Sequence, residues 1–285
     1  MWGFFPIYFK ALQIVPSLQI MFHRVVWSFL FVMVLILLRR DWTRFRDSIV
    51  KPRILLVYLM SASLLAVNWL IYIYGINSGQ IVETSLGYFI NPLLSVALGV
   101  IFLRERLRAM QWVPVGLVAL AVLYLTLQYG SLPWIALALA FSFGMYGLIK
   151  KVAPLGSLHG LSLETGILFI PAVLYLLYAE SQAHGSFGNL GWNITLLLAF
   201  SGVLTALPLL LFARSARIIP LTLLGILQYI APTVQFLLGV FLYQEPFTLT
   251  LLVGFAIIWL ALLIFALEGI YYRRKTTIAM PATQL

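Results

Sequence analysis

The sequence has no cysteine and few charged residues. Without cysteine, the chain forms no disulfide, no thiolate nucleophile, no iron–sulfur cluster and no cysteine-ligated zinc site. Charged residues make up 9% of the 285 residues and hydrophobic residues 63%, whereas a soluble domain carries about 25% charged residues. This composition excludes an ordinary soluble fold. It also excludes intrinsic disorder, which requires low hydrophobicity and high charge.

Enzyme motifs are also missing. The three histidines, His23, His159 and His184, form no HExxH pattern, so the sequence indicates no zinc site. There is no P-loop that would point to ATP as the energy source, and no GxSxG that would point to a hydrolase. We therefore expect a protein that is not an enzyme and needs no cofactor or metal.

Long apolar runs occupy most of the chain, and the links between them are short. A bilayer core about 30 Å thick requires about 20 apolar residues per helix. The runs of about this length are Ser17–Leu38, Arg53–Ile76, Gln80–Leu103, Ala109–Gln128, Leu132–Ile149, Ser157–Tyr178, Leu190–Ala213, Ile219–Tyr243 and Thr248–Ile270. Because they are apolar on all sides, they do not fit the alternating strands of a membrane β-barrel. The sequence predicts an all-α integral membrane protein.

A shorter apolar piece, Met1–Phe9, precedes these runs. At about 1.5 Å per residue it covers only half a bilayer, and it lacks the basic start of a secretory signal. We interpret it as the last half of a first helix, truncated at its N-terminus. The natural protein is then expected to begin roughly ten or more residues upstream, enough to complete the span. With this piece, we expect about ten transmembrane helices.

The basic residues lie in short clusters between the apolar runs, so the net charge of +10 does not indicate nucleic-acid binding. With both termini in the cytoplasm, the inner loops and the tail hold 16 of the 18 Lys and Arg residues, Lys150 and Lys151 among them. Lys10 then lies outside and Arg24 lies within a helix. Such a bias fixes the orientation by the positive-inside rule.

The two halves of the sequence match at a constant offset of 140 residues. The segment from Pro92 to Glu105 recurs from Pro232 to Glu245, with Pro, Gly and Glu in one register. We interpret residues 1–128 as a first five-helix repeat with an incomplete first helix, 129–272 as a second repeat, and 273–285 as a cytoplasmic basic tail. Because an odd number of helices separates them, the two repeats are inverted, as in many secondary transporters.

Two matched prolines indicate where a substrate would bind. Pro92 and Pro232 each lie about 18 Å into a predicted helix, close to the membrane midplane. Each removes an amide donor and frees the carbonyl four residues earlier, at Tyr88 and Gln228. Bare carbonyls are costly in hydrocarbon, so they face protein, water or a ligand. Matched broken helices favour a cavity, and a simple packing kink is the alternative.

Polar residues follow the same helix at helical spacing. Thr84, Tyr88, Asn91 and Ser95 share one face, and other polar residues can face the same space. We expect a wet cavity, with interhelical hydrogen bonding as the alternative. Trp69 and Tyr74 are expected to be packing or interfacial residues instead. The predicted substrate-binding residues are Arg24, Asn68, Tyr72, Tyr88, Asn91, Glu164, Gln228 and Gln235.

Charges within spans are functional candidates by default. Arg24 and Glu164 lie 140 residues apart in the sequence, and inversion separates them by about 10 Å in depth. That is too far for an obvious ion pair. They are either two poles of a substrate site or groups that reach their nearer surface or bond locally.

The candidates for proton coupling are His23, Glu83 and Glu164. A packed His23 and a Glu83 exposed at the outer surface are the simpler readings. Glu105 and Glu245 fall between helices, where we expect each to cap the helix that follows.

The same residues carry a family resemblance. Val82–Leu93 (VETSLGYFINPL) resembles the signature of RarD-type proteins in the EamA branch of the drug/metabolite transporter superfamily. His23–Ser28 and Gly99–Leu107 fit the same pattern. The resemblance implies a carrier of the bacterial inner (plasma) membrane with duplicated five-helix halves. The RarD name is associated with chloramphenicol sensitivity, but no motif settles the substrate.

Together these observations predict a secondary active transporter that exports small metabolites or drug-like molecules by alternating access. Its expected partners are a small-molecule substrate, the lipid bilayer and, as a hypothesis, protons. A passive channel or facilitator is the first alternative, which would show neither saturation nor counterflow. An integral-membrane lipid-modifying enzyme is the second, but it would need a clustered nucleophile and base that the sequence does not display.

Overall fold

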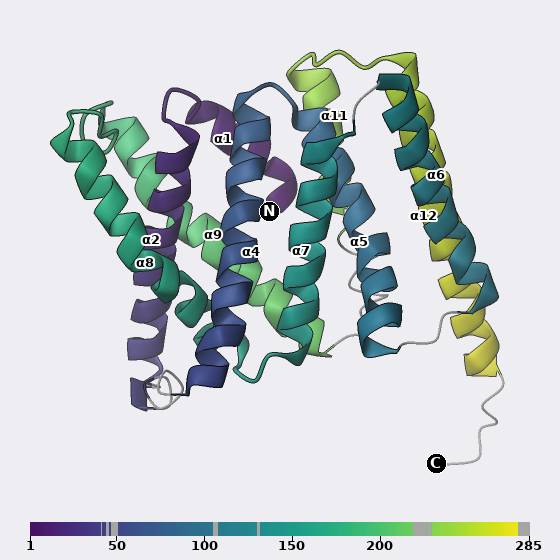
Figure 1. Cartoon of the computed structure of the whole chain (residues 1–285), viewed down its shortest axis with the longest axis horizontal. Helices are drawn as coiled ribbons and strands as arrows, with labels where there is room; N and C mark the ends of the chain where they lie inside the picture. The colour runs from purple at the N-terminus through teal and green to yellow at the C-terminus, as the bar shows by residue number, and fades with distance from the viewer. Residues whose placement is uncertain are drawn as a thin grey trace.

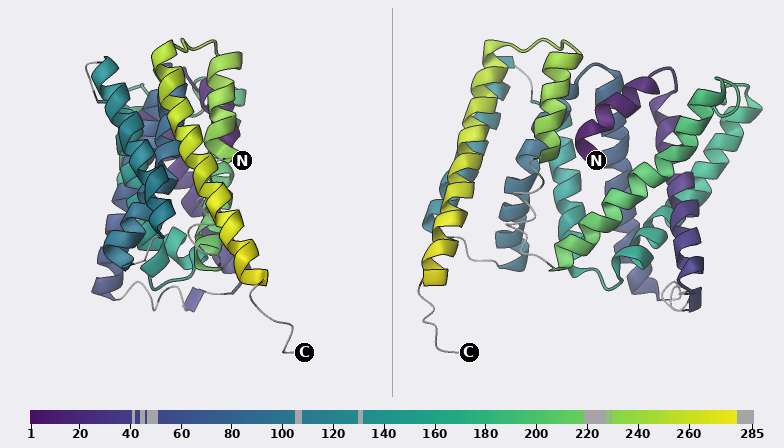
Figure 2. Two further views of the ribbon diagram at one scale, coloured as in Figure 1. Left: turned by 90° about the vertical axis from the view of Figure 1, so that its right-hand side faces the viewer. Right: turned by 180° about the vertical axis from the view of Figure 1, so that it is seen from behind.

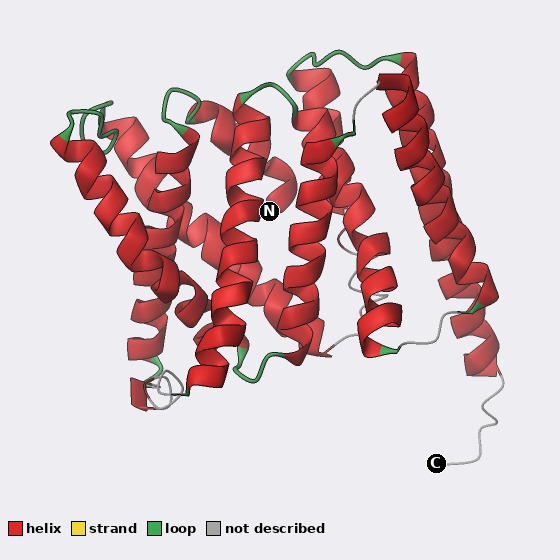
Figure 3. Cartoon of the chain, viewed as in Figure 1, coloured by secondary structure: helices red, strands yellow, loops and turns green. Residues whose placement is uncertain are grey.

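The computed structural model describes residues 1–40, 42–43, 46, 51–104, 108–129, 132–218, 228 and 230–278. Every regular element in this part of the chain is a helix (Figure 3). The elements are a 3-10 turn (Trp2–Phe4), α1 (Phe5–Ala11), α2 (Ser17–Leu38), α4 (Pro52–Asn77), α5 (Ile81–Leu103), a second 3-10 turn (Ala109–Gln111), α6 (Trp112–Tyr129), α7 (Trp134–Val152), α8 (Ser157–Ser181), α9 (Trp192–Ile218), α11 (Ile230–Leu237), a π-helical turn (Leu238–Leu242) and α12 (Leu249–Ile278).

The predicted all-helical membrane architecture is confirmed. Eight helices in the described part of the chain, α2, α4, α5, α6, α7, α8, α9 and α12, are long and apolar enough to cross a membrane. A shorter apolar helix covers Ile230–Leu242. The helix α2 has the predicted bounds, whereas α9 is observed over Trp192–Ile218 instead of Leu190–Ala213. The first part of the predicted helix Ile219–Tyr243 lies outside the described residues.

Proline marks several helix starts. Pro52 occupies the first turn of α4, and Pro16 and Pro133 directly precede α2 and α7. The amides of a first helical turn have no partner within the helix, so a proline there loses no hydrogen bond. Within hydrocarbon every other backbone group has to be bonded internally, which is why the apolar runs between these starts become helices.

The helices stand side by side and alternate in direction (Figure 1). In that view α2, α5, α7, α9 and α12 run downward, whereas α1, α4, α6, α8 and α11 run upward. The pair α6 and α12 forms one edge of the bundle, and α8 lies with α2 and α9 at the other (Figure 2). Between these edges α5 packs against α7 and α11, and α4 packs against α7 and α8.

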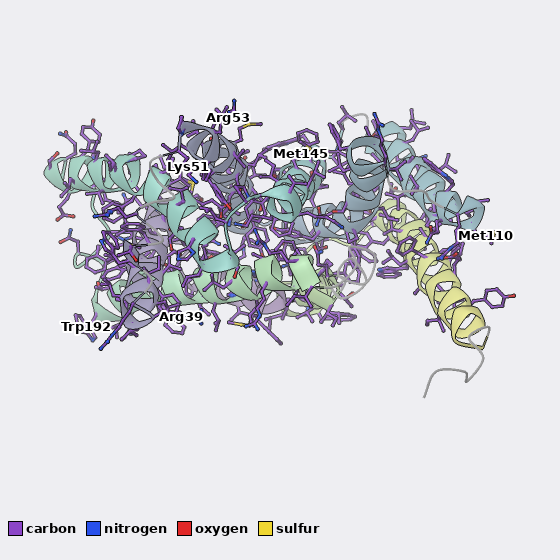
Figure 4. The ribbon with its side chains drawn as sticks, turned by 90° about the horizontal axis from the view of Figure 1, so that it is seen from below. Arg39, Lys51, Arg53, Met110, Met145 and Trp192 are labelled. Atoms are coloured by element: carbon purple, nitrogen blue, oxygen red, sulfur yellow. The ribbon has the colours of Figure 1, made fainter. Side chains whose placement is uncertain are left out.

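The ends of the helices separate the basic links from the others. The lower end in Figure 1 holds the end of α2, the start of α4, the α7–α8 link and the end of α12. These are the segments whose basic residues the sequence placed in the cytoplasm. Figure 4 views the protein from this end, with Arg39, Lys51 and Arg53 labelled. The predicted inner clusters within the described residues therefore share one end of the bundle.

Two residues with a left-handed backbone lie at matching places. Arg104, which ends α5, has φ 54°, and Gln244, just after the π-helical turn, has φ 53°. Their numbers differ by 140. A positive φ is unfavourable for residues with a Cβ and occurs at only a few per cent of them. The chain therefore leaves both of these helices through the same uncommon turn.

The helices α2 and α9 pack closely where they cross. A Cβ at Gly202 of α9 would lie 2.3 Å from the carbonyl carbon of Trp27. At the same crossing the Ser28 hydroxyl donates to the Gly202 carbonyl oxygen over 3.3 Å. Small residues at membrane helix crossings let backbones approach in this way, and this contact joins a helix of the first half to one of the second.

Candidate functional site

A cavity of about 40 Å³ lies between helices from both halves of the chain. A polar cavity needs about 10–15 Å³ to hold a water molecule, so this one is large enough for water. Its walls come from the 3-10 turn at Trp2 and from α1, α2, α4, α5, α7, α9 and α11. The lining residues are Trp2, Phe5, Arg24, Asn68, Trp69, Tyr72, Tyr88, Phe143, Thr205, Leu209, Gln228, Ala231, Pro232 and Gln235.

Most of the predicted substrate-binding residues come together here. Those that line the cavity are Arg24, Asn68, Tyr72, Tyr88, Gln228 and Gln235. Asn91 lies in an adjoining hollow of about 20 Å³, which shares Phe143 and Gln228 with the cavity and also contains Ser95. Of the two prolines, Pro232 lines the cavity, whereas Pro92 is buried within α5 and is not among the lining residues.

Arg24 is held by groups on both sides of the bundle. It is 3% exposed, and its Nε donates to the Thr205 hydroxyl over 3.0 Å. The guanidinium lies 4.5 Å from the centre of the Trp69 ring and 5.1 Å from that of Phe9. Its Nη1 is buried and has no hydrogen-bond partner. One edge of the planar group is thus fixed, and the other is left with an unused donor.

A chain of amides and hydroxyls surrounds the rest of the cavity. The Tyr88 hydroxyl donates to Asn68 Oδ1 over 3.2 Å, and Asn68 Nδ2 donates to the Ser142 hydroxyl over 2.9 Å. Asn91 Nδ2 donates to Gln228 Oε1 over 3.1 Å, which links α5 in the first half to a residue of the second half. Thr84 instead donates to the carbonyl of Ile81 on its own helix, so it takes no part in this network.

Several polar atoms of this network have no partner. Besides Arg24 Nη1, they are the Tyr72 hydroxyl, Asn91 Oδ1 and Gln235 Oε1, all buried. Gln235 uses its amide nitrogen to donate to the carbonyl of Trp2 over 3.0 Å. Buried polar groups are normally satisfied because an unmade hydrogen bond costs about 1–3 kcal/mol. Donors and acceptors without a protein partner, gathered around one cavity, can bind a polar ligand.

The aromatic wall of the cavity was only partly expected. Trp69 was predicted to be a packing or interfacial residue, but it is 5% exposed and carries the Arg24 guanidinium on its ring. The packing part of that prediction is confirmed, because Trp69 lies in the hydrophobic core, whereas its place in the cavity wall was not expected. Tyr74, by contrast, is 46% exposed and pairs with Trp134, as an interfacial residue would.

Glu164 does not line the cavity, contrary to its selection as a substrate contact. It is fully buried and forms an ion pair with Lys150, whose Nζ lies 3.0 Å from its Oε1. Ser61 and Tyr146 also donate hydrogen bonds to its carboxylate. The assignment of Lys150 to an inner loop was wrong as well, because α7 continues to Val152 and keeps Lys150 3% exposed. Local bonding is therefore the observed role of Glu164.

The other two candidates for proton coupling also have local contacts. His23 is 7% exposed and stacks on Phe187 with 5.3 Å between ring centres. The Glu83 carboxylate accepts the amide of Ile135 over 3.2 Å, so it caps the start of α7. The expectation that Glu83 simply faces outward was wrong, since the start of α7 lies close enough to use it.

Glu245 caps a helix of the opposite half. Its two oxygens accept the amides of Ile81 and Val82, over 2.9 and 2.8 Å, at the start of α5. It was expected to cap α12, the helix that follows it, and that expectation was wrong. Burial raises the pKa of the Glu245 carboxyl, while the two amide donors act in the opposite direction. Glu105, which lies 140 residues earlier in the sequence, is outside the described residues.

This cap can be tested by substitution. Glu245→Ala leaves the amides of Ile81 and Val82 without a partner, and loss of a cap costs about 1–2 kcal/mol. We expect a lower midpoint of thermal unfolding for the purified variant in detergent. Glu180→Ala is the matched control, because Glu180 is exposed and accepts only from its own loop at Asn189 and its removal should change nothing measurable. Equal midpoints for both variants would contradict the cap.

Several lining residues were not selected from the sequence, and two of them form hydrogen bonds with selected ones. Thr205 orients Arg24, and Trp2 closes the cavity next to Gln235. No local pattern distinguishes Thr205 from other hydroxyl residues in apolar helices. For Lys150, by contrast, a signal existed. It lies just before the link to α8, and Glu164 lies seven residues after the start of that helix, about 10 Å along the axis. A long lysine side chain spans such a gap.

A helical membrane bundle with a polar cavity between the halves of its chain is an arrangement found in many secondary transporters. A model described as the EamA-like transporter family matches residues 1–127. The relatives below extend the match to nearly the full chain. The protein belongs to the EamA-like transporter family.

The relatives are bacterial proteins. The chain is 45% identical over 280 residues to the "Uncharacterized transporter YojE" of Bacillus subtilis. The alignment covers 97% of this chain and 93% of the relative. The chain is 42% identical to "Protein RarD" of Escherichia coli, with 97% and 93% covered. A solved structure described as "Crystal structure of protein" matches with a TM-score of 0.61 at 17% identity, covering 94% of this chain and 93% of that one. This last likeness concerns the fold alone.

Proposed function

We propose that this chain is a secondary active transporter that exports small metabolites or drug-like molecules by alternating access. The observation that carries the proposal is the cavity between the two halves with its adjoining hollow, where four buried polar atoms have no partner. A structural core would satisfy these groups. A carrier keeps them for its substrate and holds them near the midplane, away from both aqueous phases.

The proposal includes two inverted five-helix repeats. Helices that correspond at the offset of 140 residues run in opposite directions, as α2 and α8 or α6 and α12 do (Figure 1). Each of these two pairs also packs together, and the contact of α2 with α9 has its counterpart in that of α8 with α4. The left-handed turns at Arg104 and Gln244 occupy matching positions as well. Two-fold related halves account for all of these features at once.

We further propose that the lower end in Figure 1, where the C-terminus lies, faces the cytoplasm and that the protein resides in the bacterial inner membrane. The basic links gather at this end, which is the arrangement that the positive-inside rule requires. Proton coupling is the remaining part of the proposal. Among its three candidates, Glu164 is the one linked to a second ionisable partner, Lys150, in a network that also includes Tyr146.

Proteoliposomes test the transport cycle. Vesicles loaded with an unlabelled metabolite mixture should accelerate uptake of labelled members, because a carrier exchanges its cargo whereas a channel does not. Flux that rises linearly with concentration and shows no counterflow would contradict the carrier and support the passive channel. An imposed pH gradient should change the rate, and identical rates with and without it would remove proton coupling.

One variant links this transport to the cavity. Gln235→Leu removes a polar group from its wall, and a buried hydrogen bond lost to a substrate is worth about 1–3 kcal/mol. We expect counterflow to fall about tenfold. Gln182→Leu is the matched control at an exposed position, and it should exchange at the wild-type rate. Normal counterflow in Gln235→Leu would place the substrate path elsewhere.

A further inference from the structure

Arg24 carries a buried charge that no acidic residue in the described chain neutralises. Each described carboxylate is held by other groups. Glu83 and Glu245 cap helices, Glu164 pairs with Lys150, Glu180 bonds Asn189, and Glu268 pairs with Arg108. A charged side chain inside a bilayer is costly, and such residues normally pair with one another or mark the pathway of a substrate or an ion.

The position that matches Arg24 in the repeat provides a contrast within the same molecule. That position is Glu164, 140 residues later. Its charge is paired with Lys150 at 3.0 Å, and the group is fully buried away from the cavity. Arg24 instead lines the cavity, with one hydroxyl and aromatic rings as its contacts. Glu164 thus has its counter-charge within the protein, whereas Arg24 has none among the described residues and can pair with an anionic ligand.

The geometry of Arg24 indicates the chemistry of that partner. Thr205 holds Nε and Trp69 lies against the guanidinium, so the free Nη1 has a fixed direction. A guanidinium presents parallel donors that match the two oxygens of a carboxylate. The desolvated site would strengthen such a pair. Lysine would offer only a point charge here.

The other lining residues indicate which kind of chemical group the ligand carries besides its carboxylate. Six of the fourteen lining residues are aromatic: Trp2, Phe5, Trp69, Tyr72, Tyr88 and Phe143. Aromatic walls favour a flat apolar group, which they contact at offset or edge-on geometry. The unpartnered Tyr72 hydroxyl and Gln235 Oε1 offer additional hydrogen bonds to a polar substituent.

We infer that the cavity binds a small organic anion, with its carboxylate on Arg24 and a flat apolar or aromatic body against the surrounding rings. This inference rests on the proposed carrier function and names the substrate class for it. The cavity of about 40 Å³ is smaller than such a molecule. The ligand therefore enters when the two halves move apart, as the exchange of open forms in alternating access requires.

Binding of four probes to the full chain in nanodiscs of zwitterionic lipid tests the inference. Phenylacetate carries the anion and the ring, phenylacetamide is its neutral counterpart, 2-phenylethylamine is a cation, and inorganic phosphate is an anion without a body. A charge-assisted hydrogen bond is worth about 1.5–3 kcal/mol, so phenylacetate should bind about 10- to 100-fold more tightly than phenylacetamide. The amine and phosphate should bind more weakly than phenylacetate.

Substitutions at Arg24 assign the preference to its guanidinium. Arg24→Gln should bind phenylacetate and phenylacetamide equally. Arg24→Lys should keep a reduced preference for the anion, because the charge remains and the parallel donors are lost. Arg53→Gln, at an exposed position, is the matched control and should bind as the wild type does. The comparison of probes on the wild type needs no variant, so a poorly folded Arg24→Gln does not weaken the test.

Several results would overturn the inference. They are equal affinity for the anion and the amide, a preference for the amine, binding of phosphate as tight as that of phenylacetate, and an anion preference that survives in a folded Arg24→Gln. Counterflow separates these failures from failure of the carrier proposal. Phenylacetate that binds through Arg24 but is never exchanged defeats the carrier and supports the anion site. Exchange of a neutral or cationic compound, without anion preference, supports the carrier and defeats the anion site.

Discussion

Glu164→Gln is expected to destabilise the folded protein by about 3–5 kcal/mol, the cost of removing one member of a buried ion pair. The Lys150 side chain is 4% exposed and that of Glu164 is 0% exposed. After the substitution the Lys150 ammonium would keep its charge with no counter-charge nearby, while Ser61 and Tyr146 would lose an ionised acceptor. Lys150→Met should be about as harmful, since it leaves the carboxylate alone.

The double variant Lys150→Met with Glu164→Leu should recover most of the loss, because apolar side chains of similar volume often replace a buried ion pair at little cost. Thermal unfolding of the four proteins in detergent gives the coupling between the two sites. The control is Glu268→Gln. Its pair with Arg108 is bidentate but partly open to solvent, with side-chain exposures of 11% and 36%, so its loss should cost less than that of the fully buried pair. Equal losses for Glu164→Gln and Glu268→Gln would show that burial does not govern the pair.

Gly202→Ala is expected to destabilise the bundle by about 1–3 kcal/mol through overpacking. The new methyl group would lie 2.3 Å from the Trp27 carbonyl carbon and 2.4 Å from its oxygen. These are backbone atoms, so no side-chain rotation relieves the contact and α2 has to move away from α9. The same shift would break the hydrogen bond from Ser28 to Gly202.

Gly116→Ala in α6 is the matched control, because nothing lies within 4 Å of the position its Cβ would take. Alanine is a better helix former than glycine by roughly 1 kcal/mol, so this variant should be neutral or more stable. Both are compared by thermal unfolding and by the yield of monodisperse protein. A Gly202→Ala protein as stable as Gly116→Ala would mean that the two backbones can separate freely.

The sequence predicted those parts of the fold that depend on whether a segment prefers the lipid bilayer or water. A run of about 20 apolar residues has to be a helix in a membrane, so the bounds of α2 and the existence of the other spans followed directly. The polar residues Asn68, Tyr88 and Gln228 were also expected in one place, and they line one cavity. They could be found because polar side chains in a bilayer face the bundle interior.

Contacts between helices could not be predicted in the same way. Periodicity assigns a residue to a face of its own helix but does not identify the helix opposite, so Glu164 was taken for a substrate contact and Glu245 for a cap of α12. The end of α7 also lay beyond its predicted bound, which placed Lys150 in solvent. Each of these errors concerns a charged group whose partner lies on a different helix, and such partners follow from packing in three dimensions.

The cap that Glu245 provides has a consequence for biogenesis. Val82 leaves the ribosome 163 residues before Glu245 does, which at about 5–20 residues per second amounts to roughly 10–30 s of translation. Throughout that interval the first amides of α5 lack the carboxylate that will hold them. The N-terminal half thus inserts while the start of α5 still lacks its cap. It reaches its final form only when the segment of α11 and α12, which carries Glu245, enters the membrane.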